Sequence, residues 1–532
     1  MRTSLAPVAL LVALASGFAC VDESATASGA DDLTSVDGIE HTIDLDAFVD
    51  VPSGANDDAV KDAIHRELKS ALGALRERGI GVADRDGQRN LAGAVLVRTP
   101  LAVIATDGAT LRQVDRVRYH YHDIALVERD KLPSGPIELT LLFGDYIARA
   151  AELTPICSDD LATEPDSLWY HYQPRTSACR TAINAEATAI AAAQAALVNP
   201  NTQISARDAD RRFLTTRATL VRSAAAPTLY PEYDRLWGFA GDQARTTVLA
   251  YSFFGVDSDE SNPYDNGLIE YLRFQRVLRA RLPGVHVTET APQAFLLDFT
   301  IDGHKLANVG WDDVERWIID RTGLPAEVAG DPGKTAELLR QVIAAFSERW
   351  IVWQWPVTVR RGGVERTMTV EIRTFHGYED GTAERRLHAR WRYLEAFWHA
   401  DIFAYTGHSH FGHGPLEPWE YRTGNFPNRY QLALFNSCLS FNYYDEDFLV
   451  MHPGGSTKLD VVVNGLPAYW TGMGEATAGY LTSLLDGEHT WRDVLGAMVV
   501  DLPWQQGYDP MRAVNGELDN TYAPAGLTIA PR

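Results

Sequence analysis

Positive charge is scarce in this chain of 532 residues. Lys and Arg total 48 against 71 Asp and Glu, which gives a formal net charge of −23 at pH 7. A surface of this sign repels nucleic-acid phosphates and anionic lipid surfaces, so we expect neither as a partner. The sequence also lacks an internal repeat. Its apolar content is ordinary for a globular protein, and its length predicts two or three domains.

The apolar run near the N-terminus, residues 5–15, is too short to span a membrane and predicts an export signal. The small residues that follow lead to Cys20. This boundary resembles a bacterial lipoprotein signal, although Gly17 replaces the Leu usually found three places before the Cys. We expect a signal peptide over 1–20, lipidation at Cys20 and a flexible tether over 21–38. With lipidation, the protein would be held to a membrane of the bacterial cell envelope by its lipid alone. Without lipidation, it would be periplasmic or secreted.

Cysteine is scarce as well, with four in the chain. Cys157 and Cys179 lie close in sequence, and disulfides persist in exported proteins, so we predict a bridge between them. With Cys20 lipidated, Cys438 is left unpaired. A lone thiol in an oxidising compartment is a liability unless it is buried or used, and both interpretations stay open here.

Two regions of different pattern follow the tether. Residues 39–225 combine a helix-periodic stretch, 58–78, with several strand-like runs, which predicts an α+β region. The polar stretch 199–212 predicts a linker, and we expect a domain boundary near 225. In residues 226–532 strands and helices alternate, with a strand predicted over 285–290 and helices over 335–350 and 491–500. That alternation predicts an α/β domain with a mostly parallel sheet flanked by helices.

Two apolar runs in the second region each end on a chemically reactive residue. The run over 401–408 ends on His408, and the run over 430–438 ends on Cys438. Runs of this length are typical of strands buried on both faces of a parallel sheet. Neighbouring parallel strands would place both side chains at the carboxyl edge, where open α/β sheets bind ligands. A His beside a Cys is the minimum equipment for thiolate nucleophilic catalysis.

The motifs Tyr-Thr-Gly-His at 405–408 and Phe-Asn-Ser-Cys at 435–438 resemble the caspase-like clan of cysteine peptidases. The first is similar to the gingipain version and the second to the metacaspase version. The resemblance covers roughly 245–500 and is specific only around the two strand ends. It implies a caspase-like fold over 226–532 and hydrolysis of peptide bonds in peptide or protein substrates, without a cofactor or a catalytic metal. It also implies that segment 460–470 forms one wall of the substrate cleft.

In this resemblance Cys438 is the nucleophile and His408 its acid/base partner. The backbone N–H of Cys438 would supply part of an oxyanion hole, with Gly407 and Ser409 beside it. The clan normally has Gly in place of Ser409, which has less freedom to adopt positive φ. His413 and His410 are alternatives for the catalytic histidine.

Two other functions stay open. A chain that keeps the fold but not the chemistry would be a non-catalytic binding protein of the cell envelope. The cluster of His408, His410 and His413 resembles the metal motif of metallo-β-lactamase-like hydrolases and would suit a zinc-dependent hydrolase, although Gly412 replaces the Asp of that motif.

Weaker candidates for metal sites occur elsewhere. His120 and His122 share one face of a predicted strand, where a solvated surface is the simpler interpretation. Acidic residues crowd the loop after the strand over 246–254, but their spacing fails the EF-hand pattern. We expect a solvated loop rather than a calcium site; the residues are Asp257, Asp259, Glu260 and Asp265.

Overall fold

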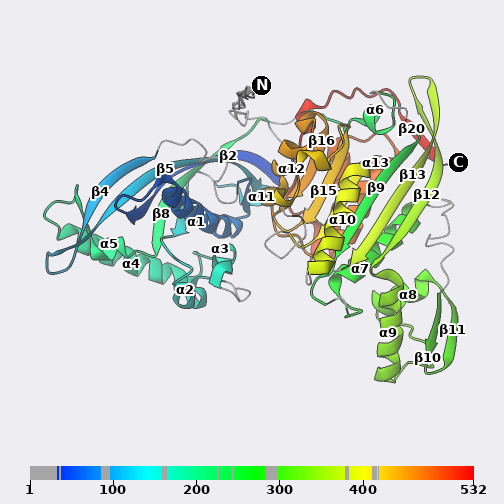
Figure 1. The fold of residues 1–532 in the computed structure, drawn as a ribbon, viewed down its shortest axis with the longest axis horizontal. Coiled ribbons are helices and arrows are strands. Elements are labelled where there is room, and N and C mark those ends of the chain that lie inside the picture. Colours follow the sequence, from blue (N-terminus) through cyan, green and yellow to red (C-terminus); the bar gives the residue numbers. More distant parts are fainter. Residues whose placement is uncertain are drawn as a thin grey trace, which may run out of the picture. The chain divides into compact units, whose positions relative to one another are not determined.

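The computed structural model describes residues 33–34, 37–84, 96–133, 135–158, 165–224, 227–240, 245–259, 261–282, 297–377, 383–409, 416 and 418–531. These residues form a mixed α/β protein with two large sheets, one of seven strands and one of nine (Figure 1). Residues Asp31–Arg532 make up one compact unit. The predicted signal peptide, the predicted lipidation site Cys20 and most of the tether lie outside the described residues.

The first sheet is antiparallel except for one parallel pair, β4 with β7, at its edge. Its order is β6-β8-β2-β5-β4-β7, with β3 paired to β5. The strands are β2 (Gly38–Pro52), β3 (Ile80–Val82), β4 (Val97–Ile104), β5 (Thr110–Glu128), β6 (Ile137–Leu142), β7 (Gln203–Ser205) and β8 (Phe213–Arg222). The α+β organisation of this region agrees with the prediction.

The helices of this region differ in how much they bury: α1 (Asp57–Arg76) buries a continuous face, whereas α4 (Ser177–Ala195) buries only Cys179. In α1 the residues Val60, Ile64 and Leu68 recur at helical spacing and are buried, and the side chain of Asn56 caps the first turn. The other helices are α2 (Ala150–Cys157), α3 (Leu168–His171) and α5 (Ala206–Ala209). The predicted disulfide is confirmed: Cys157 of α2 is bonded to Cys179 of α4.

The second sheet has the order β1-β19-β16-β15-β14-β9-β13-β12-β20. Its strands are β1 (Leu33–Thr34), β9 (Thr247–Gly255), β12 (Arg349–Arg361), β13 (Val364–Gly377), β14 (Ile402–Gly407), β15 (Gln431–Ser437), β16 (Leu459–Asn464), β19 (Arg512–Asn515) and β20 (Thr528–Pro531). Five neighbouring strands at the centre of the sheet run parallel: β16, β15, β14, β9 and β13. The outer strands pair antiparallel. The prediction of a mostly parallel sheet therefore holds only for the centre. A hairpin at 362–363 and the chain's last strands supply the antiparallel edges.

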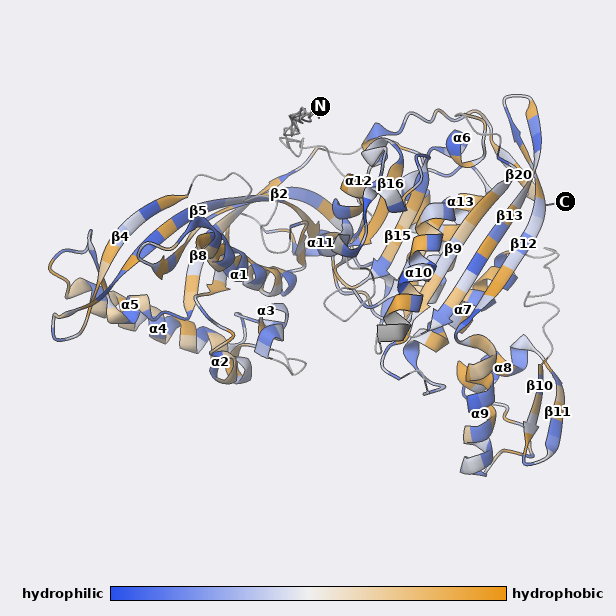
Figure 2. Cartoon of the chain, in the orientation of Figure 1, coloured by the Kyte–Doolittle hydropathy of each residue, from blue (hydrophilic) through white to orange (hydrophobic). Residues whose placement is uncertain are grey.

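The central strands are buried along their whole length. Every residue of β14, β15 and β16 is buried, whereas β12 alternates between buried and exposed positions. Figure 2 shows hydrophilic and hydrophobic residues mixed along β12. Continuous burial of this kind requires cover on both faces of the sheet.

Helices provide that cover. On one face, α10 (Ala383–His399), α11 (Ser440–Tyr444) and α12 (Asp447–Met451) pack against aromatic residues such as Phe253, Phe403 and Phe435. On the other face, α7 (Asn266–Arg281), α13 (Met473–Asp486) and α14 (Trp491–Gly496) cover Ile402, Leu434 and their neighbours. Figure 1 shows α10 crossing in front of the central strands. Helices on both sides of a parallel centre agree with the predicted α/β class.

A smaller group of two helices and a hairpin extends the apolar core on the face of the second sheet that α7 and α13 cover. The helices α8 (Trp311–Ile318) and α9 (Pro332–Phe346) lie beside a hairpin formed by β10 (Leu297–Ile301) and β11 (His304–Val309). A second hairpin pairs β17 (Val500–Leu502) with β18 (Gln505–Tyr508). A hydrogen bond links the two large regions: the side chain of Asn442 in α11 donates to the Val82 carbonyl of β3 in the first sheet.

Several predicted boundaries are wrong. The sequence predicts a helix over 335–350, but α9 ends at Phe346 and the aromatic run after it begins β12. It predicts a helix over 491–500, but α14 ends at Gly496 and Val500 begins β17. In both cases the β-branched and aromatic residues at the end favour a strand. The polar stretch predicted as a linker, 199–212, contains β7 and α5.

The domain boundary near 225 stays a prediction. The first sheet ends with β8 at Arg222, and the second resumes with β9 at Thr247. The strand predicted over 285–290 lies outside the described residues.

Asp460 gives this fold a testable pH dependence. It is fully buried in β16, where its Oδ2 accepts from Tyr430 Oη at 2.6 Å and from Asn520 Nδ2 at 2.7 Å. Burial raises the pKa of Asp460 to about 7. An unfolded Asp titrates near pH 4, so between about pH 4 and 7 the folded protein binds the extra proton and loses stability as the pH rises.

We therefore expect the free energy of unfolding of the wild type to fall by about 2 kcal/mol between pH 5 and pH 8 relative to Asp460→Asn, which has no proton to lose at this position. Urea unfolding of both proteins at the two pH values measures this difference. Parallel pH dependences in the two proteins would contradict a raised pKa at Asp460.

Candidate active site

The register of β14 and β15 brings the two predicted strand ends together. The strands are parallel, and Gly407 lies directly opposite Ser437. His408 and Cys438 each follow by one residue, so both leave the sheet at the same edge and on neighbouring strands. This is the juxtaposition that the sequence predicts.

His408 is held by three neighbours. Its Nε2 lies 2.8 Å from the Asp257 carbonyl oxygen and 3.5 Å from Asp257 Oδ1, and its ring meets the Trp470 ring edge-on at 5.5 Å between centroids. Tyr405 Oη donates to the His408 carbonyl at 2.8 Å. A carbonyl oxygen only accepts hydrogen bonds, so Nε2 carries the proton. This tautomer leaves Nδ1 as a hydrogen-bond acceptor, and none of the described residues is found bonded to it.

Asp257 reaches His408 from the third neighbouring strand. It follows β9 by two residues, and β9 pairs in parallel with β14. The sequence indicates Asp257 only as a possible calcium ligand and does not predict its contact with His408. The signal that points to its actual contact is positional: it sits at the end of a buried strand at the same sheet edge as His408 and Cys438.

Asp265 organises the loop that carries Asp257. Its carboxylate accepts the backbone N–H groups of Asp257, Ser258 and Asp259 at 3.0, 2.9 and 3.2 Å. It also caps α7 by accepting from Gly267 N at 2.9 Å. The expectation of a solvated loop is therefore wrong for Asp265, which is only 2% exposed and accepts four backbone N–H groups. Glu260 lies outside the described residues.

Cys438 directly follows β15 and is half-buried. Its Sγ lies 3.3 Å from the Ala468 carbonyl oxygen. Burial raises the pKa of the Cys438 thiol above its ordinary value, and the Ala468 backbone and the Arg76 guanidinium oppose that effect only in part. The resting thiol is thus protonated at neutral pH.

The residues expected to surround an oxyanion occupy the same edge. Gly407 ends β14, where a Cβ would lie 2.5 Å from Tyr405 Oη, so the position requires glycine. Ser409 is buried. Leu439, directly after Cys438, has φ of 51°, a left-handed conformation that turns the chain sharply into α11. The alternative histidines, His410 and His413, and Gly412 of the zinc motif lie outside the described residues.

The segment after β16 forms the surface facing both reactive residues. Ala468 contacts Cys438, and Trp470 contacts His408. Next to them, Tyr469 and Trp504 keep 51% and 61% of their surface exposed while their rings meet edge-on at 5.7 Å. Exposed aromatic side chains of this kind offer apolar surface beside His408 and Cys438.

The metal sites considered from the sequence find no support in the part of the chain that the structure describes. Within it, no group of three or more His, Cys, Asp or Glu side chains is arranged to hold a metal ion. His120 and His122 are exposed on β5 and contact Asp44 Oδ1 at 3.2 and 2.8 Å; His120 also contacts Asp46 Oδ1 at 3.0 Å. These pairs agree with the solvated strand face that the sequence favours.

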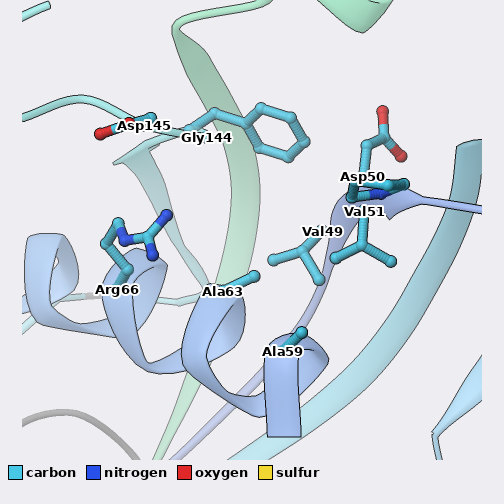
Figure 3. Close-up of a pocket in the computed structure, with 10 residues that line it drawn as sticks. Val49, Asp50, Val51, Ala59, Ala63, Arg66, Gly144 and Asp145 are labelled. Carbon is cyan, nitrogen blue, oxygen red and sulfur yellow. The ribbon is translucent and has the colours of Figure 1, made fainter. Parts of the chain in front are cut away.

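A cavity of about 210 Å³ lies in the first region, away from the residues described above. Figure 3 shows it between β2 and α1, with Val49, Val51, Ala63 and Arg66 among its walls. Asp50, which also lines it, is engaged by Arg116 in a bidentate pair at 2.8 and 2.7 Å. The cavity is mostly apolar and contains neither His408 nor Cys438.

No family model, curated protein or solved structure matches the chain. Among the described helices, none has the length and apolar character needed to cross a membrane.

We predict that Asp265→Ala frees the loop that holds His408. Removing the carboxylate leaves several backbone N–H groups without their acceptor, which should cost about 1 to 3 kcal/mol of stability. Asp265→Asn keeps an acceptor oxygen and should lose less. Urea unfolding of both variants measures the loss, and equal stability of Asp265→Ala and the wild type would contradict the role of this side chain.

Proposed function

We propose that residues 226–532 are a caspase-like cysteine peptidase domain that hydrolyses peptide bonds through Cys438 and His408. The observation that carries the proposal is the parallel register that sets Gly407 opposite Ser437, because it delivers a histidine and a cysteine to the same sheet edge. The motif resemblance at both strand ends supports the same assignment. The N-terminal pattern supports export and lipid attachment at Cys20, in the bacterial cell envelope.

In the proposed reaction His408 Nδ1 takes the thiol proton as Cys438 Sγ attacks the peptide carbonyl carbon. The raised pKa of Cys438 makes this general-base step necessary, since the resting site holds a thiol rather than a thiolate. The negative charge that develops on the carbonyl oxygen would be met by the backbone N–H groups of Cys438 and Ser409. His408 then gives the proton to the leaving amine, which breaks the C–N bond and leaves a thioester on Sγ.

Water completes the cycle. His408 Nδ1 accepts a proton from water as its oxygen attacks the thioester, and the proton returns to Sγ as the carboxylic acid leaves. Throughout, the Asp257 carbonyl holds the proton on Nε2 and so keeps Nδ1 available. A backbone oxygen performs this task, so the Asp257 side chain is expected to matter little.

A non-catalytic binding protein of the cell envelope is the second candidate. Two observations favour it: Ser409 replaces the glycine expected after the histidine, and burial holds Cys438 in the less reactive thiol form. A zinc hydrolase would require His410 and His413 as ligands with His408, whose Nε2 is already engaged by Asp257.

The deciding measurement is the rate of Cys438 alkylation by iodoacetamide between pH 5 and pH 10, followed by mass spectrometry. If His408 acts as the base, wild-type Cys438 should react at pH 7 at least about tenfold faster than Cys438 in His408→Ala. At high pH, where the thiol ionises unaided, the two rates should converge. Cys157 and Cys179 should stay unlabelled because they are bonded to each other.

Hydrolysis of a mixed peptide library tests the same assignment. We expect no cleavage with Cys438→Ala, a loss of about 10²- to 10⁴-fold with His408→Ala, and less than a tenfold loss with the control Asp257→Ala, which keeps the carbonyl oxygen. Slow labelling that His408→Ala leaves unchanged, with no cleavage by the wild type, would favour the binding protein instead.

A further inference from the structure

Glu270 is a buried residue that binds the segment next to His408 and Cys438, the proposed catalytic dyad. It lies on α7 and is only 1% exposed. One oxygen, Oε2, accepts the backbone N–H groups of Gly472 and Gly474 at 3.1 and 3.0 Å. The other, Oε1, accepts from Arg273 Nη1 at 2.6 Å. The two oxygens therefore have different partners: Oε2 binds backbone N–H groups, and Oε1 binds the Arg273 guanidinium.

The two N–H groups belong to the start of α13. This helix begins at Met473 after Gly472, whose φ of 94° excludes most other residues and which has no side chain to cap the helix. The first N–H groups of a helix need outside acceptors. Glu270 supplies one from another helix, in the manner of an N-cap residue.

The segment held in this way contacts both members of the dyad. It leaves β16 after Asn464, and its Ala468 carbonyl lies 3.3 Å from Cys438 Sγ. Its Trp470 ring meets the His408 ring, and the Trp470 carbonyl accepts from Met473 N at 3.0 Å in the turn that enters α13. Fixing Gly472 and Gly474 thus fixes the far end of the segment that touches Cys438 and His408.

The backbones of α7 and α13 also meet directly at this point. A Cβ on Gly474 would lie 2.1 Å from the Glu270 carbonyl oxygen. The approach is possible only with glycine, and it places the helix start within reach of the Glu270 carboxylate.

We propose that Glu270 is a positioning residue that locks the segment 468–474 against Cys438 and His408. The inference rests on the proposed function for its consequence in catalysis, but the lock itself is a separate structural claim. Glu270 touches neither a substrate nor the reacting atoms. It acts through the backbone of Gly472 and Gly474.

Three variants separate the backbone contact from the ion pair. Glu270→Ala removes both. Glu270→Gln can keep its amide oxygen on the two N–H groups while it loses the charge that pairs with Arg273. Arg273→Ala removes the ion pair and leaves the carboxylate in place. Should Glu270→Ala fail to fold, Glu270→Asp withdraws the carboxylate by one methylene and replaces it in the series.

Two readouts are measured on the full chain: hydrogen–deuterium exchange of peptides covering 468–474, and the rate of Cys438 alkylation by iodoacetamide against pH. We expect Glu270→Ala to raise exchange in this segment at least about tenfold and to lower His408-dependent alkylation at pH 7 by a similar factor. In Glu270→Gln and Arg273→Ala, the exchange rate of segment 468–474 and the alkylation rate of Cys438 should both stay within about threefold of the wild-type values. Rescue by Gln would separate this role from a general loss of stability.

The outcomes distinguish this inference from the proposed function. Unchanged exchange in Glu270→Ala overturns the lock. Equal damage in Glu270→Gln, Arg273→Ala and Glu270→Ala also overturns it, because the ion pair would then be the stabilising contact. Faster exchange in Glu270→Ala together with alkylation that His408→Ala leaves unchanged supports the lock and overturns the peptidase.

Discussion

The parallel pairing of β14 with β15 is the constraint on which the candidate site depends. Parallel strands deliver successive residues to one edge, and the register decides which residues face one another there. A slip of one residue would move His408 or Cys438 to the other face of the sheet. Both strands are buried on both faces, so a slipped register would set every side chain against neighbours that it does not fit, and close packing of the two faces fixes the register.

The parts of the fold that the sequence predicts well are those with a strong local period or a long apolar run. The helical spacing of Val60, Ile64 and Leu68 predicts α1 nearly to its ends. The runs that become β14 and β15 have no competing interpretation, because each is continuous, apolar and ended by a polar turn. The Cys157–Cys179 bridge follows from compartment and spacing, and the structure confirms it.

The features that escape prediction depend on partners distant in sequence. The edges of the second sheet come from β1, β19 and β20, short strands whose apolar pattern is too brief to stand out. The contact between Asp257 and His408 joins residues 151 positions apart, and nothing local to Asp257 distinguishes it from its acidic neighbours. Glu270 belongs to the same class. On the sequence it is one charged residue among several on an amphipathic helix, and only the arrival of Gly472 and Gly474 gives its burial a reason.

The direct backbone contact between α7 and α13 has a mechanical consequence. With no side chains between them at Gly474, the backbones of the two helices are in direct contact there, so a movement of one helix at this point displaces the other. The beginning of α7 carries Asp265 and the loop that holds His408, while the beginning of α13 carries the segment that faces Cys438. The carbonyl oxygens that contact His408 and Cys438 are therefore carried by loops next to two helices that touch each other. A shift of α13 relative to α7 would change the surroundings of His408 and Cys438 together.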